Sequence, residues 1–208
     1  MRVVYLHGFA SGPGSRKARF FRERLCEAGI EVAVPDLAQG DFENLTIAGQ
    51  LTVLQEAISE DAVTLMGSSM GGYLAALYAV QHPERVSRLV LLAPAFGFAE
   101  RWPTVVGEDG MKRWLSTGKL PVYHYAEGRM RDLGLAMYED SRRWEAEPDF
   151  TQPAMIFHGI RDVVVPVDTS RGFASRHRNA RLVEMESDHE LTDVLPQIWE
   201  DCRRFLLA

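Results

Sequence analysis

The sequence predicts an α/β fold with a doubly wound, mostly parallel sheet of about six strands, and three observations lead to this prediction. Short apolar runs rich in β-branched residues alternate with segments in which apolar residues recur at helical spacing. These runs are apolar throughout, as is typical of strands covered by helices on both faces of a parallel sheet. With 208 residues, of which 46% are hydrophobic, the chain is long enough to bury one sizeable core.

The first part of the chain alternates between strand and helix. Residues 2–8 form a buried strand, and a helix follows that begins after the capping residue Ser15 and stops at Gly29. Residues 30–37 are the second strand. The next helix is expected over residues 46–59, where apolar side chains recur on one face.

The same alternation continues to the carboxyl terminus. The third strand, residues 62–67, runs directly into a helix over residues 70–82 that Pro83 ends. Three more strands are expected at residues 87–94, 152–159 and 180–186. A closing helix turns five apolar residues inward: Leu195, Ile198, Trp199, Cys202 and Phe205.

Residues 96–150 interrupt this pattern. They contain three tryptophans and several tyrosines with Gly and Pro between them, but no clear strand. A segment of this length inside a compact domain usually has a function of its own. We expect a small, mostly helical cap over the strand ends, inserted into a single domain of residues 1–208. The alternative is an ordinary helical excursion that packs on the sheet.

Composition excludes several classes of protein. The net charge of −6 argues against a nucleic-acid partner, which would require clustered Lys and Arg. No signal peptide opens the sequence, and no apolar run approaches the roughly 18 residues of a membrane span, so a cytoplasmic protein is expected. Cys26 and Cys202 lack metal-ligand spacing and are interpreted as small apolar side chains. No metal and no other cofactor is predicted.

The third strand leads into a motif with the chemistry of a nucleophile. Residues 67–71 read Gly-Ser-Ser-Met-Gly, which fits the pattern G-x-S-x-G. A tight strand-to-helix turn leaves no room for side chains two residues before and two after the exposed serine. Gly67 and Gly71 have this spacing around Ser69, whereas Ser68 would have methionines there. Ser69 is therefore the candidate nucleophile, and a purely structural turn is the alternative.

A serine nucleophile requires a base that an acid orients. His189 follows the last expected strand and precedes the closing helix. It therefore lies at the carboxyl ends of the parallel strands, where ligands bind in such sheets. Asp162 follows the fifth strand and is the candidate acid. Asp188 is adjacent to His189, and neighbouring side chains point apart too readily for a dependable bond. The chain order Ser, Asp, His is the order expected for a nucleophile on a strand–turn–helix element.

Two backbone amides are candidates for an oxyanion hole. One is the N–H of Met70, directly after the nucleophile. The other is the N–H of Phe9, which follows the first strand and the permissive Gly8.

The motifs "YLHGF", "GSSMGG", "HGIRDVVVP" and "SDHEL" occur in this order and resemble the serine α/β-hydrolases over nearly the whole chain. The short length and the stretch "LHGFASGPGSRKA" are most similar to small bacterial esterases of the YqiA type. The resemblance implies an α/β-hydrolase fold and cleavage of carboxylic esters or thioesters. It also implies Ser69, Asp162 and His189 as the catalytic triad. Because the sequence begins at the strand that carries "HGF", the antiparallel strands that open larger members are not expected here.

The expected function is hydrolysis of a small-molecule ester, with an apolar acyl or aryl group, through an acyl-enzyme intermediate. A C–C bond hydrolase or an acyl-CoA thioesterase would use the same triad, and a non-catalytic ligand-binding hydrolase fold would not need it. A dinucleotide-binding oxidoreductase is excluded because Gly8, Gly12 and Gly14 do not fit G-x-G-x-x-G. A P-loop is excluded because no Gly-Lys-Ser/Thr occurs.

Overall fold

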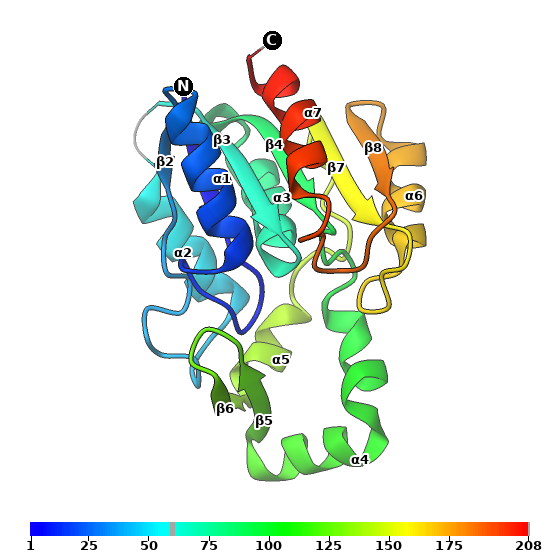
Figure 1. Cartoon of the computed structure of the whole chain (residues 1–208). Coiled ribbons are helices and arrows are strands. Elements are labelled where there is room, and N and C mark those ends of the chain that lie inside the picture. Colours follow the sequence, from blue (N-terminus) through cyan, green and yellow to red (C-terminus); the bar gives the residue numbers. More distant parts are fainter. Residues whose placement is uncertain (59–60, 208) are drawn as a thin grey trace.

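The computed structural model describes residues 1–58 and 61–207 and contains a central sheet flanked by helices (Figure 1). Six strands form this sheet in the order β2-β1-β3-β4-β7-β8, and every neighbouring pair is parallel. The strands are β1 (Arg2–Leu6), β2 (Glu31–Ala33), β3 (Val63–Ser68), β4 (Val86–Leu92), β7 (Ala154–Gly159) and β8 (Ala180–Met185). The predicted doubly wound α/β fold is confirmed.

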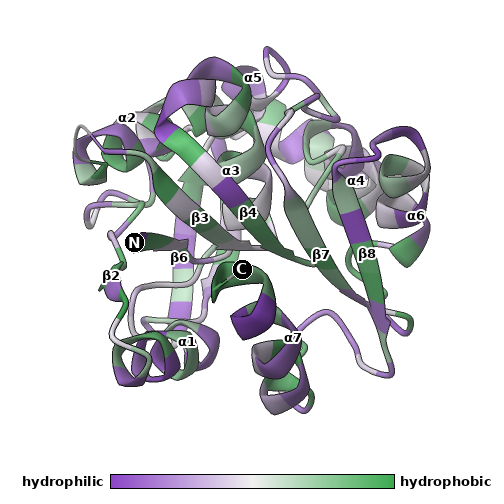
Figure 2. Ribbon diagram, turned by 90° about the horizontal axis from the view of Figure 1, so that it is seen from above, coloured by the Kyte–Doolittle hydropathy of each residue, from purple (hydrophilic) through white to green (hydrophobic). Residues whose placement is uncertain are grey.

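The inner strands are mostly apolar because helices cover both faces of the sheet, whereas the edge strands β2 and β8 carry exposed charged residues. Figure 2, a view from above, shows α1 and α7 on one face and α2, α3 and α6 on the other. The bounds of these helices are α1 (Arg16–Glu27), α2 (Ile47–Ala57), α3 (Met70–Gln81), α6 (Val167–Arg176) and α7 (Leu195–Leu207). Each face encloses its own apolar cluster, and all six residues of β3 and of β7 are buried.

Helix boundaries follow local sequence signals. The Ser15 hydroxyl accepts a hydrogen bond from the Ala18 N–H at 3.3 Å and caps α1. Gly29 follows that helix with φ of 74°, a left-handed conformation that favours glycine. The helix predicted over residues 46–59 ends at Ala57, and residue 59 lies outside the described part of the chain.

The second strand is shorter than predicted. It covers Glu31–Ala33 instead of residues 30–37 and lies at the edge of the sheet. Pro35 has no N–H to donate to a strand ladder, so pairing stops before it.

The segment of residues 96–150, expected to be mostly helical with no clear strand, contains two strands as well as helices. It contains the short helix η2 (Ala99–Arg101), the kinked helix α4 (Trp102–Thr117) and α5 (Leu135–Ser141). Between the two longer helices lies an antiparallel hairpin of β5 (Lys119–His124) and β6 (Arg129–Gly134). The prediction that this segment has no strand was wrong, because charged residues and Pro121 hide an alternation that burial reveals in β5.

The carboxyl ends of the parallel strands share one edge of the sheet. Residues 7–9 follow β1, Ser69 follows β3, and the loops after β7 and β8 carry Asp162 and His189. Figure 1 shows α4, β5, β6 and α5 beyond this same edge. The topology therefore gathers all the candidate site residues in one place.

None of the helices in the described residues combines the length and the apolar character that crossing a membrane requires.

Candidate active site

Ser69 occupies a strained turn between β3 and α3. Its φ is 53° and its ψ is −116°, a conformation that a residue with a side chain rarely adopts. The Ser69 N–H donates to the Leu92 carbonyl at 2.8 Å, and the Ser69 carbonyl accepts from the Ala95 N–H at 3.0 Å. Hydrogen bonds to the end of β4 and to the chain just after it therefore hold this turn at both the N–H and the carbonyl of Ser69.

The two glycines around Ser69 have no room for a side chain. A Cβ at Gly67 would lie 2.2 Å from the Gly71 carbonyl oxygen, and a Cβ at Gly71 would lie 2.2 Å from the Leu6 carbonyl oxygen. Both contacts are with backbone, which cannot move aside cheaply. The lack of space at both glycines therefore explains in steric terms why their spacing selects Ser69.

The two neighbouring serines differ in their surroundings. Ser68 is the last residue of β3 and is 2% exposed, whereas Ser69 is partly exposed at the strand ends. Only the Ser69 hydroxyl lies beside an imidazole: His189 Nε2 is 3.0 Å from Ser69 Oγ.

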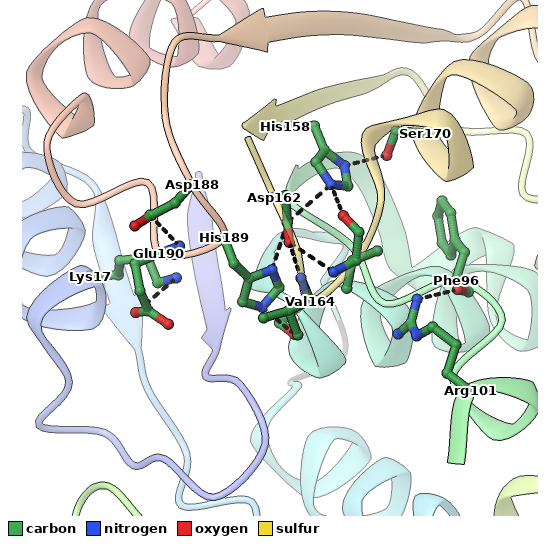
Figure 3. Close-up of polar contacts among 12 residues, drawn as sticks. Lys17, Phe96, Arg101, His158, Asp162, Val164, Ser170, Asp188, His189 and Glu190 are labelled. Carbon is green, nitrogen blue, oxygen red and sulfur yellow. Dashed lines mark hydrogen bonds and ion pairs between the residues drawn. The ribbon is translucent and has the colours of Figure 1, made fainter. Parts of the chain in front are cut away.

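His189 links Ser69 to Asp162. Its Nδ1 lies 2.7 Å from Asp162 Oδ2, and Figure 3 shows this ring and the carboxylate facing one another. Its Nε2 lies beside the Ser69 hydroxyl. The Nδ1–H donates to the carboxylate, which leaves the Nε2 lone pair free to accept the serine proton. The structure thus brings together the three residues that the sequence selected. The carboxylate of Asp188 instead accepts from the Glu190 N–H at 2.9 Å.

The Asp162 carboxylate has donors on both oxygens. Its Oδ1 accepts the N–H groups of Val164 and Val165, each at 2.8 Å. Its Oδ2 accepts from His189 and lies 3.2 Å from Nε2 of His158. Burial by itself raises the pKa of Asp162, but the hydrogen bonds from His158 and His189 outweigh it and hold the pKa well below its usual range. Asp162 is therefore an anion whenever the imidazole beside it takes up a proton.

His158 supports Asp162 from the side away from His189. It is fully buried at the end of β7, and its Nδ1 lies 2.7 Å from Ser170 Oγ. Its Nε2 faces the Val165 carbonyl at 2.8 Å as well as the carboxylate, and both groups are acceptors, so the proton resides on Nε2. Sequence reasoning missed this contact between His158 and the candidate acid. The signal for that contact is the spacing of four residues to Asp162.

Lys17 is a second residue that the sequence did not single out. It is 8% exposed, and its Nζ lies 3.7 Å from Glu190 Oε2, next to His189 (Figure 3). Burial lowers the pKa of Lys17, while the surrounding carboxylates, Glu190 first among them, raise it. The pair ties the histidine loop to α1.

The loop after β1 approaches the candidate nucleophile closely. A Cβ at Gly8 would lie 3.6 Å from the Ser69 Cβ and 3.5 Å from the Ser68 carbonyl oxygen. Phe9 follows Gly8, and Met70 is the first residue of α3, where amides have no acceptor within the helix. This geometry places the two predicted oxyanion donors on elements that meet at Ser69.

A cavity of about 370 Å³ shares Phe9 with the candidate site. Its lining combines Phe9, from the loop after β1, with residues of α4 and β5. The apolar lining residues are Trp102, Val105, Val106, Leu120, Pro121 and Val122. Volume and composition fit a small, mostly apolar ligand. Within the described residues, no group of three or more His, Cys, Asp or Glu side chains is arranged to hold a metal ion.

A family model and several known proteins are similar to this chain. The model of an uncharacterised protein family, UPF0227, matches residues 2–205. A pimeloyl-[acyl-carrier protein] methyl ester esterase from Chromobacterium violaceum is 26% identical, with 88% of this chain and 84% of that protein covered. A 2-hydroxy-6-oxononadienedioate/2-hydroxy-6-oxononatrienedioate hydrolase from Dechloromonas aromatica is 38% identical over 46% of this chain, but the match spans only 36% of that protein.

Solved structures support the fold independently. A putative hydrolase from Agrobacterium vitis superimposes with a TM-score of 0.83 at 21% identity, with 98% of this chain and 87% of that chain covered. At that identity the similarity establishes the architecture alone. Since the family model covers nearly the whole chain, the protein belongs to the UPF0227 family, a YqiA-like group with the α/β-hydrolase fold.

Proposed function

We propose that the protein is a serine esterase that hydrolyses small-molecule carboxylic esters through an acyl-enzyme intermediate. Two relatives that match over most of their length are esterases, which agrees with a carboxylic ester hydrolase. The single observation that carries the finer proposal is the chain of contacts from Ser69 Oγ to His189 Nε2, at 3.0 Å, and from His189 Nδ1 to Asp162 Oδ2, at 2.7 Å.

In the first half-reaction, His189 Nε2 takes the hydroxyl proton of Ser69 as Oγ attacks the ester carbonyl carbon. The imidazolium that forms is stabilised by the buried Asp162 carboxylate. The carbonyl oxygen, now negatively charged, accepts hydrogen bonds from the N–H groups of Phe9 and Met70. His189 then gives its proton to the leaving alkoxide, and the acyl group remains on Ser69.

In the second half-reaction, a water molecule takes the place of the alcohol. His189 removes a proton from it, and the resulting hydroxide attacks the acyl carbon of the ester at Ser69. Collapse of the second tetrahedral intermediate releases the carboxylic acid, and the His189 proton returns to Ser69 Oγ. The cycle consumes one water and leaves the triad in its starting state.

We further propose that residues 96–150 are a cap inserted into a single hydrolase domain of residues 1–208. Two backbone hydrogen bonds tie this segment to loops of the sheet: the Tyr125 N–H donates to the Ala10 carbonyl and the Gly134 N–H to the Glu43 carbonyl, both at 2.8 Å. The apolar cavity that the segment shares with Phe9 favours an apolar acyl group.

Labelling with a fluorophosphonate and mapping of the modified peptide by mass spectrometry would test the proposal. The label is expected on Ser69 and on no other serine. It should be lost in Ser69→Ala and retained in Ser68→Ala. Labelling that survives in Ser69→Ala, or the absence of any label on the folded protein, would reject the assigned nucleophile.

A further inference from the structure

The loop after β1 connects the cavity to the candidate active site. Gly8 packs against Ser69, and Phe9, the next residue, lines the cavity. The Phe9 ring lies 5.8 Å from the ring of Trp102, centroid to centroid, at the start of α4. An acyl group attached to Ser69 would therefore meet this end of the cavity first.

The cavity continues between α4 and β5. Helix α4 is kinked at Gly107, whose φ of 75° and ψ of 165° are not helical. Gly110 lines the cavity on the second arm of the helix, and a Cβ there would lie 2.6 Å from Val106 Cγ1. On the other wall, Leu120 and Val122 of β5 are partly buried. These walls suit an unbranched hydrocarbon chain.

The two ends of β5 differ in chemistry. Its carboxyl end leads to Tyr125, whose N–H donates to Ala10, the residue after Phe9. Its amino end is Lys119, about six residues or roughly 20 Å further along an extended chain. Lys119 lines the cavity together with Arg113 of α4. The basic end of β5 is thus the end remote from the loop that touches Ser69.

The two cations are not equivalent. Lys119 Nζ lies 2.7 Å from Glu43 Oε1 and 3.7 Å from Asp132 Oδ2, so its charge is already compensated. Arg113 is exposed, and in the part of the chain that the structure describes no carboxylate forms an ion pair with its guanidinium. One unpaired positive charge therefore borders the apolar cavity. A guanidinium matches the planar, monoanionic carboxylate by a bidentate contact.

We infer that the preferred substrates are esters of unbranched acids that carry a second, free carboxylate at the far end of the chain, and that Arg113 binds this carboxylate. The inference rests on the proposed function, since the cavity takes the acyl group only if Ser69 is acylated. It narrows that function to one class, the half-esters of long-chain dicarboxylic acids. The hydrocarbon part would fill the space between α4 and β5, and the charge would remain at the solvent-exposed end.

Paired substrates test the inference. The test would compare p-nitrophenyl esters of monocarboxylic acids with mono-p-nitrophenyl esters of dicarboxylic acids of equal length. The series would run from six to sixteen carbons. The ratio of kcat/KM for the charged over the neutral ester is expected to rise above one at the chain lengths that span the cavity. Arg113→Gln should lower that ratio roughly tenfold, the equivalent of one charge-assisted hydrogen bond.

Lys112→Gln is the matched control. Lys112 precedes Arg113 in α4, pairs with Asp109 at 3.6 Å and is not one of the residues that line the cavity. Its replacement removes the same charge, so a ratio that falls equally in both variants would indicate a general charge effect and overturn the inference. So would a ratio near one in the wild type at every chain length.

A binding measurement separates this inference from the proposed mechanism. Because Trp102 lines the cavity, dicarboxylic half-esters should change tryptophan fluorescence of the Ser69→Ala protein, with a Kd about tenfold weaker after Arg113→Gln. Trp102→Phe should remove the signal. Arg113-dependent binding without any ester hydrolysis by the wild type would reject the mechanism and keep the site. Hydrolysis by the wild type without discrimination between the paired esters would keep the mechanism and reject the carboxylate site at Arg113.

Discussion

Nε2 of His158 lies 3.2 Å from Oδ2 of Asp162, the same oxygen that receives the Nδ1–H of His189. The candidate acid therefore stands between two imidazoles, one at the partly exposed site and one fully buried. With the hydroxyl of Ser170 on the other nitrogen of His158, the polar chain extends two residues beyond the triad. Since every polar group in it has a partner, removal of one member leaves an unsatisfied buried group.

His158→Leu is expected to lower kcat about tenfold and the free energy of unfolding by ~1–3 kcal/mol, because it removes a donor to a buried carboxylate. The effect should fall on kcat with KM nearly unchanged, as expected of a residue that positions Asp162 without touching substrate. His158→Gln, which keeps an N–H donor, should recover part of the rate. Ser170→Ala leaves Nε2 in place and should cost less than His158→Leu. Equal loss in both variants, or a rise in KM alone, would contradict a positioning role.

Ser69→Ala should lower kcat for ester hydrolysis by roughly 10⁶-fold, as removal of a triad nucleophile does. Ser68→Ala should keep most of the activity, because His189 Nε2 contacts the Ser69 hydroxyl and Ser68 is buried at the end of β3. Circular dichroism and thermal unfolding would verify that both variants fold. Equal loss of hydrolysis in the two variants would contradict the assignment of Ser69, and not Ser68, as the nucleophile.

Asp162→Asn should lower turnover by about 10⁴-fold, because the amide cannot hold His189 in the required tautomer. It should also change how stability depends on pH. The pKa of Asp162 is lower in the folded state than in the unfolded chain, so the unfolded chain binds the extra proton first as pH falls. The stabilisation is fully present above the ordinary Asp pKa of about 4 and is lost as pH falls below it.

Urea unfolding at pH 7, 5, 4 and 3 would reveal this linkage. The gap in unfolding free energy between wild type and Asp162→Asn is expected to be widest at pH 7 and to narrow toward pH 3. Asp188→Asn, a change to the exposed carboxylate beside His189, is the control and should leave the profile close to that of the wild type. A gap that stays constant with pH would show that Asp162 does not carry the linkage.

Gly67→Ala should destabilise the fold by about 1–3 kcal/mol and abolish most activity, because the new Cβ would meet the Gly71 carbonyl oxygen at 2.2 Å. The turn would have to open, which moves Ser69 Oγ away from His189. Gly14→Ala, in the loop before α1, has no atom within 4 Å of the new Cβ and should remain close to wild type. Urea unfolding and p-nitrophenyl ester hydrolysis would be measured on both. Full activity in Gly67→Ala would mean that the turn is less constrained than its packing indicates.

Much of the fold was predictable because its determinants are local. Apolar runs of strand length, helical spacing and caps such as Ser15 lie within a few residues of the elements that they specify. The hairpin of β5 and β6 was missed for the opposite reason. Only one face of β5 is buried or partly buried. Its sequence, Lys-Leu-Pro-Val-Tyr-His, shows little alternation of apolar and polar residues by which a strand could be recognised.

By itself, the sequence determined which serine can occupy the turn and the order of the three candidate site residues. Glycine spacing and strand order are written in the chain, and parallel strands must end at one edge. Only the tertiary structure decided that His158 shares an oxygen of Asp162 with His189, and that Arg113 borders a cavity opened between α4 and β5. Contacts of this kind depend on how separate loops and helices pack in space, and no spacing along the chain specifies those distances.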